Sequence, residues 1–231
     1  MKLSVRRLGR VDYQQALDLQ LQLVEQRRAE QIPDTLLLLE HPPVITMGRS
    51  AVDSDILASA EELERAGATL HRITRGGETT YHGPGQLVGY IIANLYEHQR
   101  QLKRFISNLE QLFIQLLAEH YAISAHRDDE HRGVWVGNEK ITAVGIAVNR
   151  SITMHGFAFN VHTDLSHFGW IVACGITDRG QTSLQRLIGR KVPLAEAGDA
   201  VVQSFEALFG YEIEDPDAGS FRTTVGISGS D

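Results

Sequence analysis

GVWVGNEKITAVGIAVNRSITMHGFAFNV, residues 133–161, is the part of the chain whose pattern indicates the fold most clearly. It holds three runs rich in β-branched and aromatic residues, separated by the pairs Gly137-Asn138 and Asn149-Arg150. Such pairs favour the tight turns that join the strands of β-hairpins. The stretch therefore predicts a meander of three antiparallel strands.

Helical patterns lie on both sides of this meander. Residues 100–121 have apolar side chains at i, i+3, i+4 and i+7 spacing, which predicts a helix packed on the core. Before the meander, Asp12 is placed to cap an N-terminal helix that ends ahead of Pro33, and Ser59 to cap a short one. After the meander, residues 180–189 and 194–211 predict two more helices, the second of which ends at Gly210.

Further strands are predicted upstream. Residues 35–48, TLLLLEHPPVITMG, form an apolar run interrupted by two prolines, which indicates a buried strand leading into a shaped loop. Residues 68–75 and 86–95 indicate strands on either side of a glycine-rich loop. The fold class predicted is α+β, a mixed or antiparallel sheet flanked by helices with a smaller helical C-terminal part. We expect a single domain over residues 1–214 and a loose, polar tail over residues 215–231.

The composition excludes several classes of protein. The chain has 231 residues, of which 42% are hydrophobic, and no apolar run approaches the roughly 18 to 20 residues of a membrane span. A net charge of −7 without a long basic run argues against nucleic-acid binding. One cysteine excludes an internal disulfide, and the N-terminus lacks the apolar core of a secretion signal, so we expect a cytoplasmic protein.

The glycine-rich loop, RGGETTYHGPG, has no nucleotide-binding pattern. The chain contains no G-x-x-x-x-G-K-[ST] motif, and GPGQLVG lacks the spacing of a dinucleotide loop. It also leads into a strand, not into the helix that a pyrophosphate requires. Ordinary turn chemistry would explain these glycines, but the neighbouring guanidinium, hydroxyl and imidazole groups indicate the wall of a binding site.

Cys174 and Lys140 are the candidate reactive residues. A lone cysteine is usually an inert core residue, although Gly175 after it leaves space for a substrate. Lys140 lies at the entry of an apolar strand, where it is either a solvated hairpin residue or points inward. An inward lysine beside a thiol would lower the pKa of the thiol.

Five blocks in this order resemble one known family. EHPPVITMG, RGGETTYHGPGQLVGY, GVWVGNEKITAVGIAV, HGFAFNV and ACGI are similar to those of the lipoyl(octanoyl) transferases, the lipoate-protein ligase B type. The similarity runs from about residue 36 to residue 189. It implies the fold of the biotin and lipoate ligases, without a metal or organic cofactor.

The resemblance also implies an activity: transfer of octanoyl from octanoyl-acyl carrier protein to a lysine of a lipoyl domain, the first step of protein lipoylation. The acceptors implied are the lipoyl domains of 2-oxoacid dehydrogenase subunits and the glycine cleavage H protein. Cys174 would be the acyl-thioester nucleophile and Lys140 the residue that tunes it. The residues implied to surround the acyl group are Arg75, Gly76, Gly77, Glu78, Thr79, Thr80, Tyr81, His82, Ala143, Val144, Gly145, Gly156, Phe157 and Ala158.

Two other functions remain open from the sequence: an ATP-dependent lipoate-protein ligase, and a non-catalytic acyl-binding module. His82 is followed by Gly83-Pro84-Gly85, where the ATP-using relatives have an acidic residue, which favours a donor that arrives already activated. The stretch HRDDEHR, residues 126–132, lacks regular ligand spacing and predicts a solvated loop, not a metal site. Arg72, Arg75, Arg132 and Arg150 are candidates for a basic rim that meets acidic protein partners.

Overall fold

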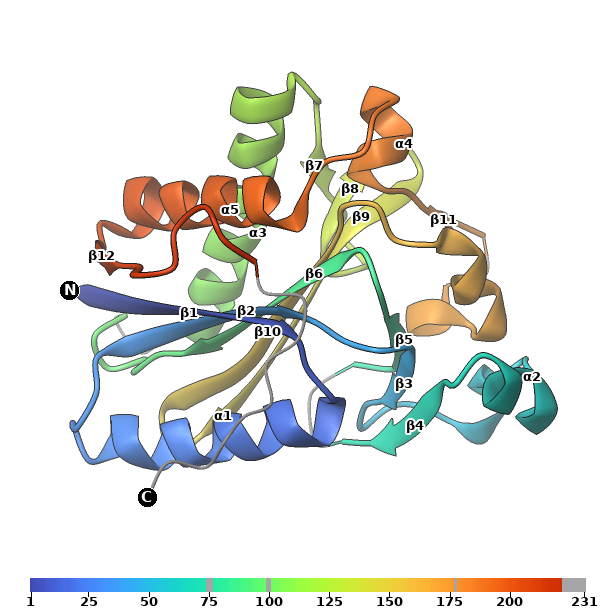
Figure 1. Ribbon diagram of the computed structural model, residues 1–231, viewed down its shortest axis with the longest axis horizontal. Helices are drawn as coiled ribbons and strands as arrows, with labels where there is room; N and C mark the ends of the chain where they lie inside the picture. Colours follow the sequence, from blue (N-terminus) through green and yellow to red (C-terminus); the bar gives the residue numbers. More distant parts are fainter. Residues whose placement is uncertain (74–76, 99–100, 177, 222–231) are drawn as a thin grey trace.

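The computed structural model describes residues 1–73, 77–98, 101–176 and 178–221, with the side chain of Cys174 left undescribed. Within them one mixed sheet runs through the molecule in the order β12-β1-β2-β6-β10-β9-β8-β7, with β11 paired to β9 (Figure 1). Its strands are β1 (Lys2–Arg10), β2 (Asp34–Glu40), β6 (Gln86–Ile92), β7 (His126–Arg127), β8 (Val134–Val136), β9 (Glu139–Asn149), β10 (Ile152–Asn160), β11 (Gly180–Gln181) and β12 (Glu212–Glu214).

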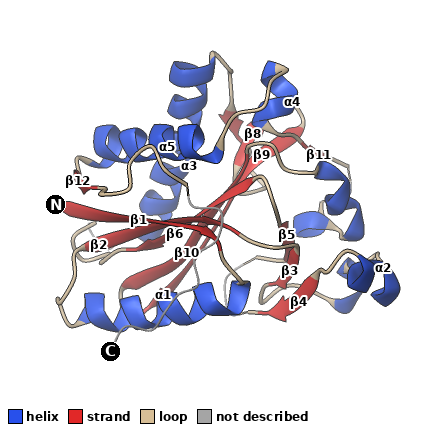
Figure 2. Ribbon diagram, in the orientation of Figure 1, coloured by secondary structure: helices blue, strands red, loops and turns tan. Residues whose placement is uncertain are grey.

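Helices α1 (Tyr13–Arg28), α3 (Leu102–Tyr121) and α5 (Leu194–Phe209) cover the two faces of this sheet (Figure 2). The shorter helices are α2 (Ala60–Arg65) and α4 (Leu184–Ile188). Helix α1 packs on one face, against β6 and β10, while α3 and α5 pack together on the other. The apolar run of β2 reflects this arrangement, because Leu36 and Leu38 enter the α3/α5 core and Leu37 and Leu39 the α1 core.

The predicted meander and helices are confirmed. Strands β8, β9 and β10 are antiparallel neighbours, and a turn at Gly137 separates the first two. Asp12 accepts hydrogen bonds from the backbone amides at the start of α1, and Ser59 forms a capping box with Glu62 at α2. Gly210 ends α5 in the left-handed conformation.

Strand β1 is an element that the sequence patterns did not predict. It pairs in parallel with β2 and β12 and buries Leu3 and Val5. The sequence of β1 does not show the usual alternation of apolar and polar residues, because the next inward position is Arg7, which is 2% exposed. The guanidinium of Arg7 contacts Asp199 and Asp215, so the charge lies inside with carboxylate partners.

A second sheet of three strands, in the order β4-β3-β5, stands beside the main one (Figure 1). It consists of β3 (Val44–Met47), β4 (Thr69–Arg72) and β5 (Thr79–His82). The structure differs here from two predictions made from the sequence. The run 35–48 forms two strands in two different sheets, and part of the expected glycine-rich loop is strand β5. Both differences arise from tertiary pairing, since β3 hydrogen-bonds β5 across more than 30 residues of chain.

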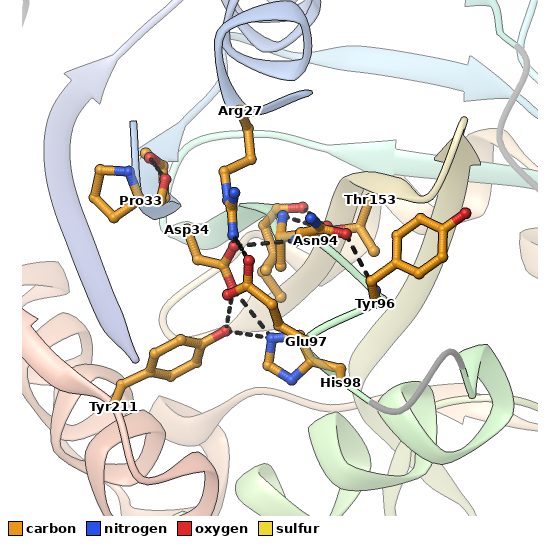
Figure 3. A network of polar contacts seen from close by, with 12 residues as sticks. Arg27, Pro33, Asp34, Asn94, Tyr96, Glu97, His98, Thr153 and Tyr211 are labelled. Atoms are coloured by element: carbon orange, nitrogen blue, oxygen red, sulfur yellow. Dashed lines mark hydrogen bonds and ion pairs between the residues drawn. The ribbon is translucent and has the colours of Figure 1, made fainter. Parts of the chain in front are cut away.

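A polar network joins four separate segments of the chain around Asp34, at the start of β2 (Figure 3). Asp34, at the start of β2, accepts hydrogen bonds from Arg27 of α1, from His98 and from the Tyr211 hydroxyl. Burial alone would raise the pKa of Asp34, but the hydrogen bonds from His98, Arg27 and Tyr211 hold this pKa below its ordinary value. The carboxylate is therefore ionised inside the fold.

None of the helices in the described ranges has the length and apolar content that crossing a membrane requires.

Candidate functional site

A cavity of about 380 Å³ lies between strand β5, together with the residues just before it, and strands β6, β9 and β10 of the main sheet. Eleven of the candidate catalytic and acyl-binding residues line it, drawn from three separate segments of the chain. They are Gly77, Glu78, Thr80, His82, Lys140, Ala143, Val144, Gly145, Gly156, Phe157 and Ala158. The sheet therefore brings most of the candidate residues to one hollow.

Antiparallel register places the two small-residue segments opposite each other. Gly145 pairs with Gly156, Val144 with Phe157, and Ala143 with Ala158. Close approach of the strands requires the glycine at 156, because a Cβ there would lie 2.1 Å from the carbonyl oxygen of Gly89 on β6. The cavity floor is thus backbone and short side chains, which suits an extended apolar ligand.

Strand β5 sends alternate side chains to opposite sides, so only part of the predicted segment reaches the cavity. Thr80 and His82 line it, but Thr79 donates its hydroxyl to Asp55, and Tyr81 hydrogen-bonds His167 on the far side. Arg75 and Gly76 lie outside the described residues.

His82 has a defined orientation. Its Nδ1 lies 2.8 Å from the side-chain oxygen of Gln86, whose amide nitrogen donates to Asn160. The turn between His82 and Gln86 is held by Glu40, which accepts a hydrogen bond from the Gly85 backbone amide at 2.9 Å. The imidazole is therefore fixed on the cavity wall by residues of β2, β6 and β10.

Lys140 points inward, the second of the two orientations left open by the sequence. It is 2% exposed and lines the cavity. A much smaller cavity of about 10 Å³ shares Lys140 and Thr80 with the first and is also lined by Ala173. The turn Ala173–Gly175, which carries Cys174, therefore lies next to the lysine.

Glu78, the residue just before β5, lies against this turn. A Cβ added to Gly175 would lie 2.4 Å from Glu78 Oε2, so carboxylate and turn are in direct contact. That oxygen is buried and has no hydrogen-bond partner in the described part of the chain. Gly175 has φ +66°, a conformation that lets the chain pass this close to the carboxylate.

A further wall of the cavity comes from a segment of which only Arg132, a rim candidate, was singled out from the sequence. Residues 126–132, expected as a solvated loop, are mostly exposed, but Glu130, His131 and Arg132 also line the cavity. Asp128 accepts the backbone amides of Glu130 and His131 and pairs with Arg179. The Arg179 guanidinium and these two amides lower the pKa of Asp128 to about 2.

Other lining residues that sequence reasoning missed are Tyr13, Ile73, Tyr90, Ile106, Ile146 and His155. Tyr90 hydrogen-bonds the Nε2 of His41, a fully buried imidazole whose Nδ1 donates to the carbonyl of Val11. Burial lowers the pKa of His41 to about 4, so this ring is neutral near pH 7. His155 lies on β10 at φ +60°, and nothing in its sequence neighbourhood signals that conformation.

The candidate rim arginines are dispersed. Arg132 lines the cavity and its side chain is 58% exposed, whereas Arg72 pairs with Asp53 on the small sheet. Arg150 lies in the turn after β9, and Arg75 is outside the described residues. No group of three or more His, Cys, Asp and Glu side chains in the described ranges is arranged to hold a metal ion.

Comparisons with known proteins show the family of the chain. The family pattern of the lipoyl protein ligase A/B catalytic domain matches residues 12–206. An octanoyltransferase of Caldicellulosiruptor saccharolyticus is 52% identical over 211 residues, 91% of this chain and 90% of the relative. An octanoyltransferase of Desulforamulus reducens is 46% identical over 226 residues, 98% of this chain and 99% of the relative.

Solved structures share the architecture at low sequence identity. The crystal structure of lipoate-protein ligase A bound with ATP has a TM-score of 0.70 at 14% identity, over 95% of this chain and 91% of that one. The bi-partite lipoate protein ligase of Thermoplasma acidophilum has a TM-score of 0.68 at 14% identity, over 93% and 85%. The predicted α+β fold with a mixed sheet flanked by helices is confirmed.

Proposed function

Because the chain belongs to the family of lipoyl protein ligase A/B catalytic domains and is an octanoyltransferase of protein lipoylation, we propose that it works through a thioester at Cys174. The Cys174 thiolate attacks the carbonyl carbon of the octanoyl thioester on the donor. A carbon–sulfur bond forms to Sγ, the carbon–sulfur bond to the donor breaks, and the donor sulfur leaves and takes up a proton from solvent. A neutral lysine amine of the acceptor then attacks the same carbonyl carbon: an amide bond forms, the bond to Sγ breaks, and the amine loses a proton to solvent as the Cys174 thiolate is released.

The observation that carries the proposal is the buried ammonium of Lys140 beside the turn of Cys174. A positive charge in that position stabilises the attacking thiolate in the first half-reaction and the leaving thiolate in the second. Exchange between two thioesters is nearly isoenergetic, so placement and charge matter more than a driving force. Nothing in this scheme consumes ATP.

The cavity over β9 and β10 is the site that we assign to the acyl chain. Seven carbons beyond the carbonyl, at about 0.8 kcal/mol for each buried CH₂, contribute roughly 5 kcal/mol before ordering costs. Gly145, Gly156 and Ala158 leave room for the chain along the strands. A chain shorter by one carbon therefore binds only a few-fold less tightly.

The activity implies an acyl-carrier-protein donor and lipoyl-domain acceptors. We assign octanoyl-acyl carrier protein as the donor, and lipoyl domains of 2-oxoacid dehydrogenase subunits and the glycine cleavage H protein as acceptors. Arg132 supports an electrostatic contact, because it is exposed at the cavity that we assign to the acyl chain.

Intact-mass analysis tests the mechanism. Mixed with octanoyl-acyl carrier protein alone, the protein should gain one octanoyl group that hydroxylamine removes, and Cys174→Ala should gain none. Cys174→Ser tests whether the thiol is required, since it keeps the size of the side chain. Full transfer by Cys174→Ala would refute the thioester, and a strict need for ATP would favour the ligase reaction.

A further inference from the structure

The ammonium of Lys140 lies on an aromatic ring. Its Nζ is 4.8 Å from the centroid of the Trp135 ring, and the two residues are paired across β8 and β9. Both are buried, Lys140 at 2% and Trp135 at 1% exposure. No ion pair in the described part of the chain includes Lys140. Within the described residues, the ring of Trp135 is a group that attracts this buried charge.

The same ring also meets the segment that follows Cys174. The Arg179 guanidinium carbon lies 5.3 Å from the Trp135 centroid. Arg179 pairs with Asp128, which stays ionised at neutral pH and offsets the second cation near the ring. Gln181 pairs in register with Lys140, and the Thr182 amide donates to the Lys140 carbonyl at 3.0 Å. Trp135 therefore lies where the lysine strand and the cysteine segment join.

The Trp135 ring is restrained by a hydrogen bond and by burial. Its Nε1 donates to the carbonyl of His131 at 3.2 Å, and its body is enclosed in the core. The face that it presents to Lys140 is therefore fixed before any substrate binds.

We propose that Trp135 is a positioning residue for the reaction: its indole face holds the Lys140 ammonium at the turn of Cys174 without neutralising it. A carboxylate paired with the Lys140 ammonium would cancel the field that the thiolate needs, whereas a ring attracts the cation through its quadrupole and leaves the net charge in place. The Glu78 carboxylate lies against Gly175 of the turn, and in the described part of the chain it forms no ion pair with Lys140. This inference rests on the proposed roles of Cys174 and Lys140.

Fluorinated tryptophans test the proposal, because each added fluorine weakens the attraction of the ring for a cation with little change in size. The chain has two tryptophans, so the series is made in a Trp170→Phe background and compared with the unfluorinated Trp170→Phe protein. Iodoacetamide alkylation of Cys174 near pH 7 and single-turnover acylation should both slow stepwise, by about three- to tenfold over the series. Rates that do not change with fluorination would overturn the proposal, because packing alone is insensitive to the ring quadrupole.

Substitutions distinguish the contribution of the Trp135 ring from that of Lys140. Trp135→Phe should shift the alkylation profile of Cys174 to higher pH in the normal protein and should have little effect in Lys140→Met, where the cation is absent. Phe159→Leu, a buried aromatic change elsewhere in the α3/α5 core, should leave the profile in place. If Lys140→Met does not alter the profile, the role of Lys140 fails and this proposal with it. If Lys140→Met shifts the profile and Trp135→Phe does not, only the role of Trp135 fails.

Discussion

At the scale of single residues, the shape of the cavity depends on where a side chain is missing. Gly156 faces Gly145 across β9 and β10, and its other neighbour is the Gly89 carbonyl on β6. The ring of Phe157 occupies the space above Gly89, where a Cβ would lie 2.0 Å from it. These glycines let three strands approach closely and leave the hollow above them open.

Substituting Gly156 should damage both the fold and the hollow. Gly156→Ala forces a methyl group against backbone, so β6 and β10 must separate, at a cost of about 1–3 kcal/mol in unfolding free energy. Urea unfolding measures the loss, and octanoyl transfer should fall with it. Gly169→Ala is the matched control, since nothing lies within 4 Å of its added Cβ. Equal stability of the two variants would contradict the packing argument.

At the scale of elements, helix α3 does more than cover the sheet. Glu110 on its buried face is 2% exposed and accepts the backbone amide of Gly133 at 3.1 Å. Its other carboxylate oxygen lies 3.5 Å from Arg127 and 3.8 Å from Arg132. The helix therefore anchors both ends of the segment whose middle lines the cavity.

We expect Glu110→Ala to lower the unfolding free energy by about 1–3 kcal/mol, because the Gly133 amide loses its buried acceptor. The Michaelis constant for the acyl donor should rise more than the turnover number falls, since the wall moves and the reacting groups do not. Glu110→Gln keeps an acceptor and should lose less. Glu119→Ala, an exposed change on the same helix, should have no measurable effect on either quantity. A donor Michaelis constant that Glu110→Ala leaves unchanged would rule out this anchoring role.

At the scale of the whole molecule, charged residues far from the cavity hold together segments that are distant in the sequence. Asp34 joins α1, β2, the segment after β6 and Tyr211, which lies between α5 and β12 (Figure 3). Arg7 similarly joins β1 to Asp199 of α5 and to Asp215. Asp215 belongs to the stretch expected to be loose, so at least this residue has a fixed contact with the domain.

The pKa of Asp34 predicts how stability depends on pH. Because this pKa is below its ordinary value of 3.8, the ionised carboxylate favours the folded state. The contribution is complete above about pH 4 and is lost as the pH falls through the folded-state pKa. Asp34→Asn should cost about 3–5 kcal/mol at pH 7, and chemical denaturation should show the two proteins converging in acid.

Asp53→Asn is the control for this experiment. The Asp53 side chain is 86% exposed in its pair with Arg72, so its loss should cost no more than about 1 kcal/mol at any pH. A difference between Asp34→Asn and the unaltered protein that stays constant down to pH 2 would contradict the assignment of the charge to Asp34.

Elements with local signals could be predicted from the amino-acid sequence alone. The period of 3.6 residues in α3, the caps Asp12 and Ser59, and the turns of the β8–β10 meander are all contained in short windows. Burial on both faces of β2 could also be predicted, because an unbroken apolar run is stable only when both faces are covered. The small residues of β9 and β10 were identified by family resemblance, and their pairing follows from the hairpin.

Contacts between residues distant in the sequence could be known only from the tertiary structure. It separated Thr80 and His82 from Thr79 and Tyr81 by the pleat of β5, a strand that exists because β3 pairs with it. It turned Lys140 onto Trp135 and brought Glu130–Arg132 to the cavity through Glu110 and Asp128. Strand β1 could not be predicted for the same reason. Arg7 occupies an inward position in this strand, and carboxylates distant in the sequence stabilise it there. Contacts of this kind depend on the three-dimensional path of the chain, and no local window of sequence contains both partners.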